Sequence, residues 1–150
     1  TGLRSYKDAG IQLKAEISTP LVISIFNPES PMHDGAIILQ NTLIEAAGCI
    51  LPLTESQMIL PDMGTRHRAA LGISEESDAI VIIVSEEKGS ILTAENGRFT
   101  HLDHDEMTLR RYLNERLFIS SGDWDNLYDS AIEITSSKFY NGTIWFKRKV

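Results

Sequence analysis

The sequence predicts a single-domain α/β fold, in which helices pack on the faces of a mixed, largely central β-sheet. Apolar runs rich in β-branched residues, typical of buried strands, alternate with amphipathic segments typical of helices. Some of the strands follow one another through short polar turns, so hairpins are expected and the sheet should be mixed. With 150 residues, 42% of them hydrophobic, the chain can bury one core. We assign residues 1–118 to this domain and expect 119–150 to be a C-terminal extension of unknown role, packed on the same domain.

The first part of the chain is expected to be helical. Residues 3–16 mix helix-forming residues with a glycine. A helix is predicted over 18–27, where Ser18 or Thr19 can cap the first turn and Pro20 suits it.

A hairpin of two buried strands is predicted next, over residues 36–40 and 43–53, with Pro52 ending the second strand. From Pro61 the pattern changes to that of a helix, because apolar residues recur near one face and β-branched residues are few. The run over 78–87 is a continuous apolar strand that ends in polar residues, as in a central strand covered on both faces.

The last elements are a second hairpin and a helix. Residues 90–95 and 98–102 flank an Asn-Gly turn, and 103–117 are amphipathic with a capping box at their start. The final segment, 142–150, is compatible with an edge strand or an interaction tail.

Composition excludes several classes of function. A formal net charge of −7 argues against a broad surface that follows nucleic-acid phosphates. No signal peptide and no stretch of membrane-spanning length is present. Cys49 is the single cysteine, so one chain can form neither a disulfide nor a cysteine metal site. We therefore expect a cytoplasmic protein without a nucleic-acid partner, and no membrane segment within residues 1–150.

Two short motifs carry the polar chemistry. His33 and Asp34 precede Gly35 at the start of a predicted strand, although an Asp-Gly pair is most often a plain turn. Residues 64–68, with the sequence Gly-Thr-Arg-His-Arg, stand at a predicted helix start, where N–H groups, the helix dipole and arginine forks favour phosphate. A solvated basic helix face is the alternative for the second motif.

A third candidate is the acidic set Ser85, Glu86 and Glu87 at the end of the predicted central strand. Ligands of open α/β sheets collect outside the carboxyl ends of strands, so acids there can hold a cation or a ribose hydroxyl. The alternative is a strand that has simply reached water. Together, the three motifs form a metal-plus-phosphate set that chance assembles less readily than any one of them.

Two further clusters have simpler explanations. His101, Asp103, His104 and Asp105 resemble a metal cluster, but acids are also preferred at a helix start, and a helix cap is the favoured reading. The triplet 74–76 repeats the Ser-Glu-Glu sequence at a helix end, where a surface loop is expected.

The motifs "MHDGAIIL", "GCILPL", "GTRHRAALGISEESDA" and "IVIIVSEE" resemble the diadenylate cyclase domain family. The similarity covers roughly residues 2–117, and residues from about 119 onward match nothing recognisable. Met32 stands where the family often has leucine, which is a conservative exchange.

The resemblance implies a role for each matching residue. The metal set would be His33, Asp34, Glu86 and Glu87, and the catalytic set Asp34, Gly35, Arg66, His67 and Arg68. The ATP-binding set would be Gly35, Ala36, Leu51, Gly64, Thr65, Arg66, His67, Arg68, Ser85 and Glu86, with Leu51 at the adenine and the basic triplet at the triphosphate. Gly35 also lets the backbone come close to the nucleotide.

The resemblance further implies a nucleotidyltransferase that condenses two ATP into cyclic di-AMP and two pyrophosphates. Its cofactor would be a divalent metal, Mn²⁺, Mg²⁺ or Co²⁺, and its partner a second copy of the chain in a dimer with facing sites. Two alternatives stay open. One is a non-catalytic module of the same fold that binds ATP or cyclic di-AMP. The other is a metal-dependent phosphoesterase that uses His101, Asp103, His104 and Asp105.

Overall fold

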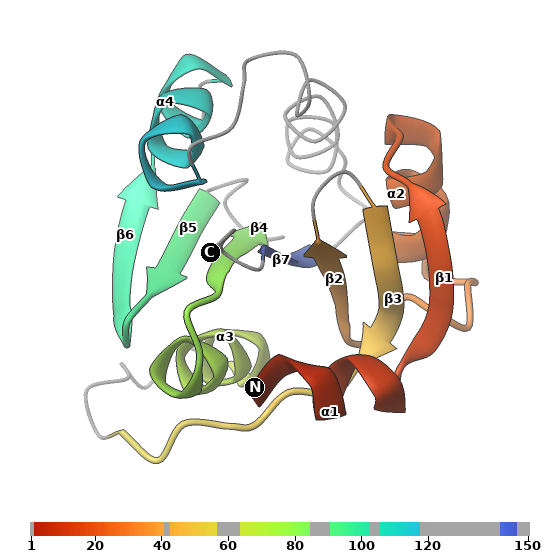
Figure 1. The fold of residues 1–150 in the computed structure, drawn as a ribbon, viewed down its shortest axis with the longest axis horizontal. Helices are drawn as coiled ribbons and strands as arrows, with labels where there is room; N and C mark the ends of the chain where they lie inside the picture. Colours follow the sequence, from red (N-terminus) through yellow and green to blue (C-terminus); the bar gives the residue numbers. More distant parts are fainter. Residues whose placement is uncertain are drawn as a thin grey trace.

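A mixed β-sheet forms the centre of the molecule (Figure 1). The computed structural model describes residues 2–40, 43–56, 64–84, 91–102, 106–117 and 142–146. Its strands are β1 (Ile11–Glu16), β2 (Ala36–Gln40), β3 (Leu43–Cys49), β4 (Ile80–Val84), β5 (Ile91–Glu95), β6 (Arg98–Leu102) and β7 (Gly142–Phe146). The seven strands are ordered β1-β3-β2-β7-β4-β5-β6. Among the strands that the structure describes, only β2 and β7 are parallel neighbours, so the predicted mixed sheet is confirmed.

Helices cover both faces of this sheet, as predicted. They are α1 (Gly2–Ala9), α2 (Thr19–Phe26), α3 (Thr65–Glu76) and α4 (Glu106–Leu117). On one face, Ile73 of α3 belongs to the same buried cluster as Val81. On the other face, Ile25 of α2 and Leu109 of α4 share a cluster with Ile82. In Figure 1, α1 and α3 lie below the sheet and α4 lies above it. None of the described helices is both long and apolar enough to cross a bilayer.

The two inner strands are buried on both faces. Residues 80–83 of β4 have no exposed side-chain area, and residues 36–39 of β2 are at most 2% exposed. Consecutive residues of a strand point to opposite faces, so a strand covered on both faces must be apolar throughout. This confirms the predicted central strand and the first strand of the predicted hairpin.

The N-terminal segment differs from the expectation in one respect. The helix that Ser18 caps is present, and the Ser18 hydroxyl accepts a hydrogen bond from Leu21 N at 3.3 Å. Residues 11–16, however, form the edge strand β1, which was not predicted. Lys14 has a φ of 52° and the pairing register shifts between Gln12 and Ala15, so a bulge breaks the alternation that identifies a strand.

The C-terminal strand is central, which corrects the prediction of an edge strand or an interaction tail. β7 pairs in parallel with β2 and antiparallel with β4, and thus lies in the middle of the sheet. Both of its partners are far away in the sequence. Local patterning identifies a strand but contains no information on such long-range pairing.

Candidate functional site

One edge of the sheet collects the ends of three strands. Ile37 of β2 pairs with Ile144, and Val84 of β4 pairs with Gly142. The chain therefore enters β2 and leaves β4 at the same edge, with β7 between them, a separation of roughly 10 Å. β3 ends there too, because Cys49 pairs with Ala36. We call this the site edge.

His33 and Asp34 lie at the site edge, directly before β2. The His33 backbone N–H and ring Nδ1 both contact the carbonyl oxygen of Ser30, at 3.3 and 2.7 Å. A carbonyl oxygen can only accept, so Nδ1 must carry the proton, and in the neutral ring Nε2 keeps a lone pair for a metal ion. Asp34 is exposed, and its carboxylate has no hydrogen bond or ion pair with any described residue.

Gly35 fixes the position of this pair. Its φ is +115°, and a Cβ there would lie 2.7 Å from Gly48 C and 2.9 Å from Cys49 N. Only glycine allows both this backbone conformation and this close approach to β3. The sequence analysis connected Gly35 with a nucleotide; the structure adds that the glycine brings the Asp34 backbone onto β3.

The basic triplet lies at the start of α3, which begins at Thr65 with Gly64 as its N-cap, so the helix start predicted at residues 64–68 is confirmed. Gly64 precedes the helix and supplies no side-chain cap, and the first turn contains no acidic residue. The positive end of the helix dipole is therefore reinforced by Arg66 and Arg68, which favours an anion. Arg68 is exposed, whereas His67 is half-buried, with its ring centroid 6.1 Å from that of Phe99.

Leu51 is connected with α3 by the segment that follows β3. Its side chain is 9% exposed, whereas the neighbouring Ile50 and Leu53 are 69% and 53% exposed. Thr54 N donates to the carbonyl oxygen of Arg68 at 3.0 Å. The predicted adenine contact and the predicted phosphate contacts are thus on segments that touch.

The acidic set Ser85, Glu86 and Glu87 lies outside the described residues, as does the predicted capping residue Asp103. Among the described residues, no group of three or more His, Cys, Asp or Glu could hold a metal ion. The imidazole of His33 and the carboxylate of Asp34 supply two donors of types that divalent ions accept. These two residues therefore fit a divalent ion at the site edge. The end of β4 lies at the same edge of the sheet.

The triplet 74–76 is not the surface loop that the sequence predicted. It forms the last three residues of α3, and Ser74 is 1% exposed. Each member binds a different segment. Gly97 N donates to Ser74 Oγ at 3.0 Å, Thr54 Oγ1 donates to Glu75 Oε1 at 2.8 Å, and Tyr6 Oη donates to Glu76 Oε2 at 2.9 Å. Partial burial, followed by the bond to Glu76, raises the pKa of Tyr6.

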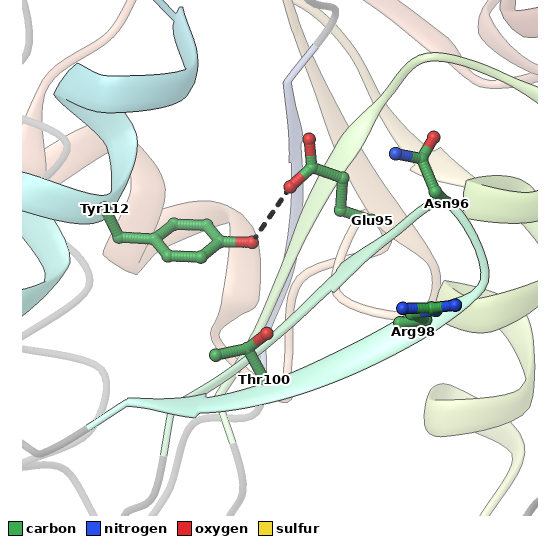
Figure 2. Close-up of a pocket in the computed structure, with 5 residues that line it drawn as sticks. All are labelled: Glu95, Asn96, Arg98, Thr100 and Tyr112. Carbon is green, nitrogen blue, oxygen red and sulfur yellow. Dashed lines mark hydrogen bonds between the residues drawn. The ribbon is translucent and has the colours of Figure 1, made fainter.

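A separate hollow of about 360 Å³ lies between the β5–β6 hairpin and α4 (Figure 2). Its lining is Glu95, Asn96, Arg98, Thr100 and Tyr112. The Glu95 carboxylate accepts from Tyr112 Oη at 3.3 Å and from Arg116 Nε at 2.8 Å. The Arg116 guanidinium also lies 3.6 Å from the centre of the Tyr112 ring. We call this hollow the hairpin hollow.

The predicted phosphoesterase cluster is not supported by the part that is described. His101 is exposed on β6 and does not line the hairpin hollow. Asp103, His104 and Asp105 lie outside the described residues.

Comparison with known proteins identifies the family. A model of the DisA bacterial checkpoint controller nucleotide-binding (DAC) family matches residues 1–99. The cyclic di-AMP synthase CdaA of Bacillus subtilis is 50% identical over 113 residues, 75% of this chain and 41% of that protein. The diadenylate cyclase of Mycoplasma pneumoniae is 37% identical over 121 residues, 80% of this chain and 59% of that protein.

A solved structure agrees with these sequence matches. The crystal structure of a double cysteine mutant of DacA from Staphylococcus aureus superposes with a TM-score of 0.71 at 46% identity, covering 77% of this chain and 76% of that chain. The chain spans about two fifths of the length of CdaA from Bacillus subtilis and of a diadenylate cyclase from Listeria monocytogenes. Since the family model matches about two thirds of the chain, this protein belongs to the DisA bacterial checkpoint controller nucleotide-binding family.

Proposed function

We propose that this chain is a diadenylate cyclase that converts two ATP into cyclic di-AMP and two pyrophosphates. The observation that carries the proposal is the site edge, where the exposed Asp34 carboxylate stands before β2 and the segment after β3 contacts the basic start of α3. The relatives from Bacillus, Listeria and Mycoplasma are named as a cyclic di-AMP synthase and as diadenylate cyclases, which supports the same reaction.

The ATP contacts follow from the character of each residue. The start of α3 would bind the triphosphate through the N–H groups of Gly64 and Thr65, and through the side chains of the basic triplet. Leu51, which is apolar and nearly buried, would contact the adenine. Gly35 and Ala36 would border the ribose, and Ser85 the phosphates.

The divalent metal would be held by His33 and Asp34, together with Glu86 and Glu87. When bound, the metal lowers the pKa of the ribose 3′-hydroxyl and screens the negative charge of the triphosphate. Asp34 orients the hydroxyl through its carboxylate, and the basic triplet stabilises charge that develops on the α-phosphate and on the leaving pyrophosphate. In each half-reaction an O3′–Pα bond forms, the bond from Pα to the pyrophosphate oxygen breaks, and the 3′-hydroxyl loses its proton.

The reaction requires two copies of the site. Each 3′-hydroxyl must face the α-phosphate of the other ATP, and a two-fold dimer presents the same site from both sides. We therefore propose that product forms between two facing chains. Specific activity at saturating ATP should rise with protein concentration until the dimer is populated. Activity proportional to enzyme in a sample shown by ultracentrifugation to be monomeric, with ATP and metal present, would contradict the dimer.

The direct experiment incubates the purified protein with ATP and Mn²⁺ and identifies products by chromatography and mass spectrometry. Cyclic di-AMP and pyrophosphate are the expected products. Binding of ATP without turnover would instead favour the non-catalytic module. Hydrolysis of added cyclic di-AMP would favour the phosphoesterase.

A further inference from the structure

The segment after β3 is bonded to α3 through the backbone and the side chain of Thr54. Residues 50–56, which we call the strap, contain no helix or strand among the residues described, yet Thr54 is only 6% exposed. Thr54 N donates to Arg68 O at 3.0 Å. The Thr54 hydroxyl lies 2.8 and 3.0 Å from the two carboxylate oxygens of Glu75, and accepts from Ser56 N at 3.0 Å. One threonine thus bonds to the helix at two places and orders the strap beyond it.

The bond to Glu75 is of a strong type. A hydroxyl that donates to an ionised carboxylate forms a charge-assisted hydrogen bond, roughly twice as strong as a neutral one. Thr54 is almost excluded from water, so its hydroxyl cannot readily exchange this bond for a bond to solvent, although Glu75 itself is exposed. A carboxylate at the end of α3 therefore holds a loop that lies against the middle of the helix.

Gly72 allows the strap to lie directly on the helix. A Cβ at this position would come 2.9 Å from Thr54 N and 3.0 Å from Pro52 C, so any other residue would push the strap away. Glycine inside a helix costs about 1 kcal/mol relative to alanine. The close contact with the strap is a physical reason for a glycine in this helix.

The consequence concerns the spacing of the nucleotide contacts. Leu51 is on the strap, whereas Arg66 and Arg68 are on α3, so no covalent geometry fixes the distance between adenine and phosphate contacts. Thr54 is three residues after Leu51 on the strap, and its N–H donates to the carbonyl oxygen of Arg68 itself. Any shift of the strap along the helix would change the spacing of the two contacts.

We propose that Thr54 and Glu75 form a positioning pair that sets the spacing between the adenine contact on the strap and the phosphate contacts on α3. The inference rests on the proposed function, since it assumes that ATP occupies the site edge. It predicts a specific asymmetry. A ligand that spans both contacts depends on the pair, whereas a ligand that reaches only the start of α3 does not.

The test compares ATP with inorganic tripolyphosphate, both titrated in the presence of Mn²⁺ by calorimetry. Thr54→Val keeps the shape of the side chain and removes the hydroxyl. We expect its affinity for ATP to fall about tenfold, the loss typical of one strong hydrogen bond, and its affinity for tripolyphosphate to stay within about twofold of the parent. Thr54→Ser, which keeps the hydroxyl, should restore ATP binding. Thr100→Val, the same exchange at an exposed position of β6, is the matched control and should behave like the parent.

Two results would overturn the positioning pair. One is a Thr54→Val protein that binds ATP like the parent; the other is an equal loss of affinity for both ligands, which indicates general damage to α3. If Thr54→Val does not fold, Glu75→Gln replaces it, because glutamine keeps one acceptor oxygen but loses the charge. This variant must show a smaller loss of affinity for ATP, again without a loss of affinity for tripolyphosphate. A parent protein that binds neither ligand contradicts the proposed function, and is thus distinguished from failure of the pair alone.

Discussion

The site edge and the hairpin hollow both contain charged side chains, but these side chains interact differently. In the hairpin hollow, Glu95 is bonded to Arg116 and Tyr112, so opposite charges neutralise each other within the protein. At the site edge, Asp34 and Arg68 are exposed, and their side chains form no bond with the part of the chain that is described. Charges that satisfy each other stabilise a fold, whereas charges without an internal partner are available to a ligand. The difference therefore separates a structural polar cluster from a candidate binding site.

The largest effect is expected at Asp34. Asp34→Asn keeps the size of the side chain and removes the charge that would hold the metal, so formation of cyclic di-AMP should fall at least about a hundredfold. The melting temperature should stay within about 1 °C of the parent, because the side chain is exposed. Product quantified by mass spectrometry and a thermal melt check both parts. Turnover at the parent rate would remove Asp34 from the site.

The next effect concerns the phosphate contacts. Arg68→Ala should weaken ATP binding roughly tenfold, the loss typical of a hydrogen bond to a charged group, and leave stability unchanged. Arg98→Ala removes the same charge from the hairpin hollow and is the matched control. Calorimetry with ATP should separate the two variants. Equal affinities for ATP would mean that the basic triplet is a solvated helix face.

A substitution at the hairpin hollow should lower the stability of the fold and leave the affinity for ATP unchanged, which is the opposite of the effect expected at the site edge. Arg116→Ala removes the ion pair with Glu95 and the stacking on Tyr112, and should lower the free energy of unfolding by about 1–2 kcal/mol. Affinity for ATP should not change. Arg4→Ala is the control for charge, since the pair of Arg4 with Asp8 is 3.9 Å long and largely exposed. Urea unfolding of the parent, Arg116→Ala and Arg4→Ala proteins measures the difference in unfolding free energy. An Arg116→Ala protein that is as stable as the parent but binds ATP more weakly would place a nucleotide contact at the hairpin hollow and contradict this assignment.

The smallest effect is expected at Cys49, which is buried beside the site edge. Burial raises the pKa of its thiol from 9.0 to about 11, so little thiolate is present at neutral pH. A raised pKa means that the neutral form is favoured in the folded state. The resulting stability is fully present below pH 9 and is lost as the pH rises through about 11. The folded protein should react with a thiol reagent only slowly at pH 8, and a fast reaction without denaturant would contradict the burial.

The sequence predicted well the features that contiguous residues encode. The buried strands β2 and β4, the Ser18 cap and the turn between β5 and β6 each follow from a local pattern. β1 was missed because its bulge interrupts the alternation, and the central position of β7 depends on partners far away in the chain. Local sequence does not determine such pairing.

The candidate site shows the same division. The motifs at 33–35 and 64–68 were found because their chemistry is contiguous in the sequence. The pair of Thr54 and Glu75 was missed because its members are 21 residues apart and belong to segments of ordinary composition. Gly72 was the one available signal, since a glycine inside a predicted helix indicates close contact with another segment.

Amide hydrogen exchange with and without ATP and Mn²⁺ tests the comparison between the two regions most directly. ATP at the site edge should slow exchange in residues 33–36, in the strap and in residues 64–68. Exchange in residues 95–102 and 109–116, around the hairpin hollow, should stay unchanged. Protection confined to the hairpin hollow, with none at the site edge, would contradict the assignment of the nucleotide site.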